Sequence, residues 1–93
     1  MLHIIKTESG LVDALNYMDQ EDQILLIEEA VFAIFRPNSV LTQQKDLNDH
    51  TWVLEADLIA RGLTLSPDSK IQSIDFTGFI YLTEQAKSSM TWE

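Results

Sequence analysis

The chain has 93 residues, of which 45% are hydrophobic and 23% are charged, a composition that predicts one small globular domain spanning residues 1–93. Its net charge of −9 and its six scattered Lys and Arg residues argue against direct binding of nucleic acid, which normally requires a basic stripe. It contains no cysteine, which excludes disulfides, thiolate metal ligands and any step that needs a thiol.

The sequence also lacks the usual marks of membrane targeting. No stretch reaches the roughly 18 consecutive apolar residues that a membrane span needs. The start, MLHIIKTESG, lacks the basic segment, long apolar run and cleavage site of a signal peptide. We therefore expect a cytoplasmic protein that makes no contact with a membrane.

The first elements of the chain are expected to be a strand and then a helix. Met1–Ile5 ends in branched apolar residues, which favours a strand. Across Leu11–Met18, apolar residues recur at positions i, i+4 and i+7, which predicts a helix with one apolar face. Ser9 precedes this segment and is a candidate N-cap.

A second strand and helix are expected to follow a polar connection. Ile24–Ile27 (ILLI) is a continuous apolar run, which is typical of a strand buried on both faces. Glu28 and Glu29 come next and are suited to open a helix, EEAVFAIF, because acids favour the positive end of the helix dipole. Arg36-Pro37-Asn38 then ends that helix.

The remaining elements are less regular. Val40–Asn48 is compatible with a short polar helix or a loop. His50–Glu55 (HTWVLE) predicts a third strand, and Ile71–Ile74 predicts a weak fourth one. From Phe76 to about Ser88 the apolar spacing predicts a last helix. Because strands and helices alternate, the chain is expected to form a three-layer α/β fold with a mostly parallel sheet flanked by helices.

The charged residues of the short segment EADLIARGL, after the third strand, are those expected at the ends of a short helix. Asp57 is a candidate N-cap or first-turn acid, and Arg61 follows it at ion-pair spacing. Gly62 suits the left-handed position that follows many helices. His3 and His50 fall at predicted strand positions, away from the carboxyl ends, and are interpreted as structural residues.

Acidic residues follow three of the predicted strands. In an open parallel sheet, ligands bind beyond the carboxyl ends of the strands, so this edge is a candidate site for a divalent cation and a metal-dependent enzyme. The alternative is that each acid caps or opens the helix after its strand, which requires no ligand. The acids concerned are Glu28, Glu29, Glu55, Asp57 and Asp75.

Several large side chains are candidates for a surface that binds a protein partner. Phe32 and Phe35 lie three positions apart on the predicted second helix. Met90 and Trp92 lie so near the end of the sequence that burial within their own domain is harder to arrange. Core packing is the alternative explanation for the aromatic residues.

The whole chain resembles the B-subunit family of the bacterial sulfur-relay complex, the TusB/DsrH family. The resemblance rests on the start MLHII, the segment ILLIEEAV, the block DLIARGL (Asp57–Leu63), the later IDFTGFIYLT (Ile74–Thr83) and the ending MTW. It implies a small DsrE-like α/β fold. It also implies a heterohexamer that contains two copies each of this subunit and of homologous C and D subunits.

The resemblance further implies that the complex passes persulfide sulfur toward 2-thiolation of the tRNA wobble uridine, with the active cysteine on the D subunit. Some relatives in sulfur-oxidising bacteria have a cysteine of their own, whereas this chain has none. We therefore expect a non-catalytic structural subunit without a metal or cofactor. A metal-dependent enzyme and a free-standing acidic protein-binding module remain the alternatives.

Overall fold

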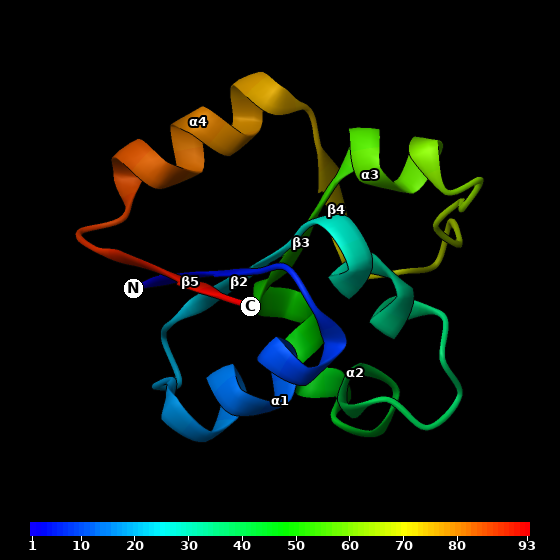
Figure 1. The fold of residues 1–93 in the computed structure, drawn as a ribbon, viewed down its shortest axis with the longest axis horizontal. Helices are drawn as coiled ribbons and strands as arrows, with labels where there is room; N and C mark the ends of the chain where they lie inside the picture. Colours follow the sequence, from blue (N-terminus) through cyan, green and yellow to red (C-terminus); the bar gives the residue numbers. More distant parts are fainter.

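The computed structural model describes the backbone of residues 1–93 and the side chains of all of them except Lys45. Five strands form one sheet in the order β4-β3-β2-β1-β5, and all four strand pairings are parallel. Helices lie on both faces of this sheet, with α4 on one side and α1 and α2 on the other (Figure 1). The three-layer α/β fold predicted from the sequence is confirmed.

The strands are short. They comprise β1 (Leu2–Ile5), β2 (Gln23–Leu26), β3 (Thr51–Leu54), β4 (Gln72–Ile74) and β5 (Ser89–Trp92). The helices are α1 (Glu8–Tyr17), α2 (Val40–Gln43), α3 (Glu55–Ala60) and α4 (Phe76–Gln85), with two 3₁₀ helices, η1 (Glu28–Ile34) and η2 (Lys45–His50). The segment Val40–Asn48, left open by the sequence, thus contains α2 and most of η2.

The larger core lies on the sheet face that carries alternate residues of the central strands. Ile5, Ile24, Leu26 and Val53 point to this face and are fully buried. The layer above them supplies small and branched residues, which allow the helices to pack closely on the sheet. These residues are Leu11 and Ala14 of α1, Ala30, Val31 and Ala33 of η1, Leu41 of α2 and Leu58 of α3.

The opposite face has a much smaller core. Its buried residues are Leu2 and Ile4 of β1 and Leu25 of β2. Around them lie apolar side chains that are only half-buried: Ile27, Trp52, Ile74, Phe79, Leu82 and Ala86. Because β1 and β2 contribute to both cores, their sequences read as continuous apolar runs rather than as alternating patterns.

Polar side chains begin the two longest helices. Thr7 is the N-cap of α1 and accepts a hydrogen bond from the Gly10 amide at 2.9 Å, so the prediction that Ser9 is the cap was wrong. Thr7 has the extended backbone that a cap needs, whereas Ser9 is already inside the helix. Asp75 caps α4 in the same way, accepting from the Gly78 amide at 2.8 Å.

Two expectations about α3 and its end have different outcomes. The N-cap position of α3 is Leu54, which makes no side-chain capping bond, so Asp57 acts as a first-turn acid and not as the cap. Gly62 follows the helix with a φ of 66°, as predicted. His50 lies at the end of η2 and is exposed, which corrects its placement in a strand.

The strand β5 was missed in the sequence. Its residues alternate between exposed and half-buried positions, as expected for a short strand with one covered face. It pairs with β1 at the edge of the sheet, where His3 lies beside Met90 and Ile5 beside Trp92. The first and last strands of the fold are therefore neighbours.

Candidate functional site

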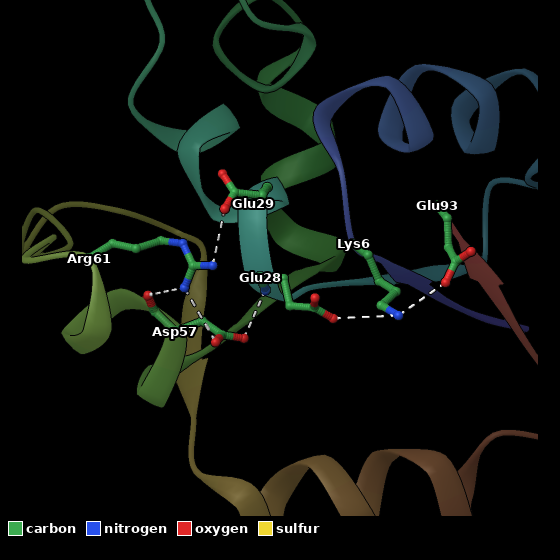
Figure 2. Close-up of polar contacts among 6 residues, drawn as sticks. All are labelled: Lys6, Glu28, Glu29, Asp57, Arg61 and Glu93. Atoms are coloured by element: carbon green, nitrogen blue, oxygen red, sulfur yellow. Dashed lines mark hydrogen bonds and ion pairs between the residues drawn. The ribbon is translucent and has the colours of Figure 1, made fainter.

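The carboxyl ends of the strands carry a chain of polar contacts that runs across the sheet (Figure 2). Near β5, the ammonium of Lys6 lies 3.1 Å from a carboxylate oxygen of Glu93 and 3.6 Å from one of Glu28. Lys6 directly follows β1, and Glu28 lies two residues after β2, so the network links the ends of three adjacent strands. This is the edge at which the sequence predicts a candidate metal site.

The other half of the network joins α3 to η1. A carboxylate oxygen of Asp57 accepts a 2.8 Å hydrogen bond from the Glu28 amide. The guanidinium of Arg61 lies 3.5 Å from the second oxygen of Asp57 and 3.4 Å from a carboxylate oxygen of Glu29. It also donates a 3.2 Å hydrogen bond to the backbone carbonyl of Asp57. These contacts fix two short helices to the same edge of the sheet.

The bond between Glu28 and Asp57 depends on an unusual backbone conformation. Glu28 has a φ of 51°, a left-handed value that non-glycine residues rarely adopt. It directly follows the extended residue Ile27 and opens η1, a 3₁₀ helix where the sequence suggested an ordinary helix. The left-handed turn costs about 1–2 kcal/mol, and Asp57 provides part of the compensation by accepting the Glu28 amide.

The two cations of this edge, Lys6 and Arg61, each lie between two carboxylates. The hydrogen bond to Glu93, together with the charge of Glu28, raises the pKa of Lys6 above its ordinary value. A lysine in this state remains protonated at neutral pH and is therefore unsuited to act as a general base. The arrangement thus has the properties of a network that positions the strand ends, and Lys6 does not act as a base within it.

The acids of this edge are spread out, and most of them already have partners. Among the side chains that the structure describes, no group of three His, Cys, Asp or Glu residues could hold a metal ion. Asp57 is engaged by Glu28 and Arg61, and Asp75 by the start of α4. Glu55 lies exposed in the first turn of α3, as the helix-opening interpretation predicts.

A second polar cluster lies at the other end of β1, inside the protein. His3 is completely buried and its Nε2 lies 2.9 Å from a carboxylate oxygen of Asp22. The indole N–H of Trp92 donates a 3.0 Å hydrogen bond to Nδ1 of His3. Because an indole can only donate, Nδ1 must be the unprotonated nitrogen. His3 is therefore neutral, with its proton on Nε2 directed at Asp22.

Asp22 is the acceptor on which this cluster depends. It accepts hydrogen bonds from His3, from the Asp19 amide at 3.0 Å and from the ammonium of Met1 at 3.0 Å. The hydrogen bond from His3 is the main reason that the pKa of Asp22 lies well below its ordinary value. The cluster ties the loop before β2 to β1 and β5, which agrees with the structural role expected of His3.

The four predicted partner-binding residues fall in two places. Phe32 is half-buried on η1, with the guanidinium carbons of Arg36 and Arg61 5.7 and 6.0 Å from its ring centre. Phe35 ends η1 and is 39% exposed. Met90 and Trp92 are half-buried on β5. The structure does not bring the two pairs together as one patch, and whether they bind a partner stays a prediction.

Trp92 has intramolecular partners that the sequence did not reveal. Its ring centre lies 5.7 Å from that of Tyr17, and it packs against the larger core. Asp22 also has partners that the sequence did not reveal, because it is one of several acids in the polar connection DQEDQ. No local sequence pattern indicates the hydrogen bond between His3 and Asp22, because the two residues are 19 positions apart.

Comparison with known proteins identifies the family. The family model for DsrH like protein matches residues 6–89. The chain belongs to the DsrH-like family. It is 35% identical over 95 residues to Protein TusB of Escherichia coli O81 (strain ED1a), covering 99% of this chain and 100% of that protein. Protein TusB of Escherichia coli O139:H28 (strain E24377A / ETEC) and that of Shigella boydii serotype 18 are each 34% identical over the same shares.

The match to the DsrH-like family includes the elements that build the polar network. The matched range contains Lys6, Glu28, Asp57 and Arg61, whereas Trp92 and Glu93 lie beyond its end. In the part of the chain that the structure describes, no helix is long and apolar enough to cross a membrane. The resemblance noted from the sequence is therefore confirmed at the level of the family.

Proposed function

We propose that this chain is a non-catalytic structural subunit of a heterohexameric sulfurtransferase complex, a sulfur relay. The complex passes persulfide sulfur toward 2-thiolation of the tRNA wobble uridine. Two copies of the chain assemble with two copies each of homologous C and D subunits in the cytoplasm. The observation that carries this proposal is a full-length relationship to TusB proteins in a sequence without cysteine.

The chemistry of sulfur transfer supports a structural role. A persulfide is held on a cysteine sulfur, and the thiolate is the nucleophile that accepts and releases it. This chain has no cysteine, so the travelling sulfur must stay on the other subunits. Neither cation of the polar network at the strand ends can act as a base, because Lys6 has a raised pKa and Arg61 is permanently charged.

The surface of the chain supports assembly with proteins rather than direct contact with tRNA. The net charge of −9 would repel the phosphate backbone. Phe35 is exposed at the end of η1, and Met90 lies on the edge strand β5, where backbone groups are open to pairing. In this proposal Phe32, Phe35, Met90 and Trp92 contribute to contacts with the partner subunits.

The two alternatives have less support. A metal-dependent enzyme would use Glu28, Glu55, Asp57 and Asp75, yet Asp57 is already bound to the Glu28 amide and Asp75 caps α4. A free-standing acidic binding module agrees with the charge but leaves the full-length relationship to TusB proteins unexplained.

Native mass spectrometry of the protein, isolated from its own host through a removable tag, tests the proposal. We expect the mass of a complex with two copies of each of three small subunits. A monomer or a homo-oligomer would contradict the proposal and favour the binding module. Calorimetry with Mg²⁺ or Mn²⁺ tests the enzyme alternative, which predicts binding heat at millimolar metal.

A further inference from the structure

The helix α4 covers the smaller core incompletely. All ten of its residues are exposed or half-buried, in contrast to α1, which buries Gly10, Leu11 and Ala14. Phe79 and Leu82 face the sheet and contact the smaller core, but neither is fully shielded from water. Figure 1 shows α4 on the side of the sheet opposite to α1 and α2. This side of the molecule therefore has a thinner outer layer.

The outward surface of α4 is apolar. Phe76, Ile80 and Tyr81 expose 67%, 44% and 60% of their area. The rings of Phe76 and Phe79 lie 5.8 Å apart, so Phe76 joins the half-buried side chains of the smaller core. We name Phe76, Phe79, Ile80 and Tyr81 the α4 surface.

The size of the α4 surface is that of the centre of an interface. Large aromatic side chains carry about 150–250 Å² each, so its three exposed residues leave on the order of 300 Å² open to solvent. A standard interface buries about 800 Å² per partner, with aromatic residues at its centre and polar residues at its rim. The α4 surface would supply the apolar centre of such an interface, and the neighbouring half-buried Ile27 and Trp52 would extend that centre.

The charges beside the α4 surface indicate the chemistry of the rim. From Asp75 to Gln85 the only charged residues are Asp75 and Glu84, and the next charged residue, Lys87, is exposed two positions after the end of α4. Asp75 and Glu84 are exposed at the two ends of α4. A second copy of this chain would bring the same acids and a further net charge of −9, which disfavours self-association. The complementary surface has an apolar centre and basic side chains around it.

We propose that the α4 surface docks one of the homologous partner subunits, through a patch on that subunit with an apolar centre and a rim of Lys or Arg. This inference rests on the proposed function and adds to it the face of the chain that the partner covers. It is separate from the predicted contacts of Phe35, which directly follows η1, and of Trp92, which lies on β5.

The first experiment compares Ile80→Ser with Val12→Ser in the chain co-produced with its C and D subunits. Val12 is an aliphatic residue of α1 that is 50% exposed on the other side of the sheet, so it is a matched control. We expect roughly a tenfold or greater loss of affinity for the partners with Ile80→Ser, in line with a central interface residue, and wild-type affinity with Val12→Ser. Circular dichroism melts should show both variants folded.

The second experiment tests the charge of the rim. Glu84→Lys should slow association with the partners, whereas Asp13→Lys, an equal change of charge at an exposed position on α1, should affect it less. An association rate that rises with Glu84→Lys would contradict the proposal that the partner's rim is basic.

The outcomes separate this inference from the proposed function. If the wild-type chain forms no complex with C and D subunits, the proposed function fails and this inference fails with it. If the wild type assembles and Ile80→Ser does so with equal affinity, only the docking site is wrong. If Ile80→Ser abolishes a homodimer and leaves the mixed complex intact, a second copy is the occupant and the inference is overturned.

Discussion

Replacing Asp22 by Asn should destabilise the protein strongly at neutral pH. The carboxylate accepts hydrogen bonds from His3, the Asp19 amide and the Met1 ammonium. His3 and the Asp19 amide share one carboxylate oxygen, and the Met1 ammonium bonds the other. An asparagine has one acceptor oxygen, so an oxygen that keeps the shared position directs its two N–H groups at the Met1 ammonium. The bond that the completely buried His3 donates then loses its charged acceptor, and a hydrogen bond to a charged group contributes about 1.5–3 kcal/mol against about 0.5–1.5 kcal/mol for a neutral one.

The lost bond from the Met1 ammonium adds to this cost, so we expect a decrease of about 2–3 kcal/mol in the free energy of unfolding. For a domain of this size, 1 kcal/mol corresponds to about 4–8 °C in Tm, and the variant should melt at least about 8 °C lower. Urea titration followed by circular dichroism measures the free energy directly. Asp19→Asn is the matched control, because it makes the same substitution at an exposed position three residues away.

The effect should depend on pH with a definite sign. Because the pKa of Asp22 is lowered in the folded protein, its stabilisation is fully present above the ordinary aspartate value of about 3.9. It is lost as the pH falls from there toward the lowered value. The gap between wild type and Asp22→Asn should therefore be constant from pH 7 to about pH 5 and shrink below about pH 4. A variant that melts with the wild type at pH 7, or a gap unchanged at pH 3, would refute this reasoning.

Three further predictions follow from single positions. Glu28→Gly should be more stable than Glu28→Ala by about 1 kcal/mol in urea titration, because both remove the same carboxylate but only glycine adopts a φ of 51° without strain. Gly10→Ala should lower the free energy of unfolding by about 1–3 kcal/mol, because the added Cβ would lie 3.2 Å from the backbone oxygen of Trp92; a melting temperature equal to that of the wild type would contradict it. Phe35→Ala should weaken co-purification with C and D subunits more than it lowers Tm, since its ring is 39% exposed; a lower Tm with intact assembly would count against its role.

The sequence predicted the elements whose signal is local. The apolar run Ile24–Ile27 corresponds to the buried strand β2, and Asp75 caps the helix that it precedes. Gly62 has the left-handed backbone expected after a helix. In each case the signal is a residue type whose own conformational or burial preference determines the outcome.

The parts that were missed depend on distant contacts. A glutamate can begin either an ordinary helix or a 3₁₀ helix such as η1, so the residue type of Glu28 does not indicate its left-handed backbone. That conformation accompanies a hydrogen bond from its amide to Asp57, which is 29 positions away. The edge strand β5 is four residues long, too short for its alternation to stand out. The sequence likewise predicted that acids would follow the strands and that Arg61 would pair with Asp57. It did not indicate that Arg61 also reaches Glu29, or that Lys6 lies between Glu28 and Glu93.

The pairing of β1 with β5 has a consequence for the order in which the fold forms during synthesis. The two strands are joined by contacts such as that of Lys6 with Glu93, which are 87 positions apart. Until β5 has left the ribosome, one side of β1 is an open edge that displays four residues destined for burial. Such late, long-range closure is slow and exposes the nascent chain to aggregation. The ribosome-bound chain should thus need protection for as long as β5 remains in the exit tunnel.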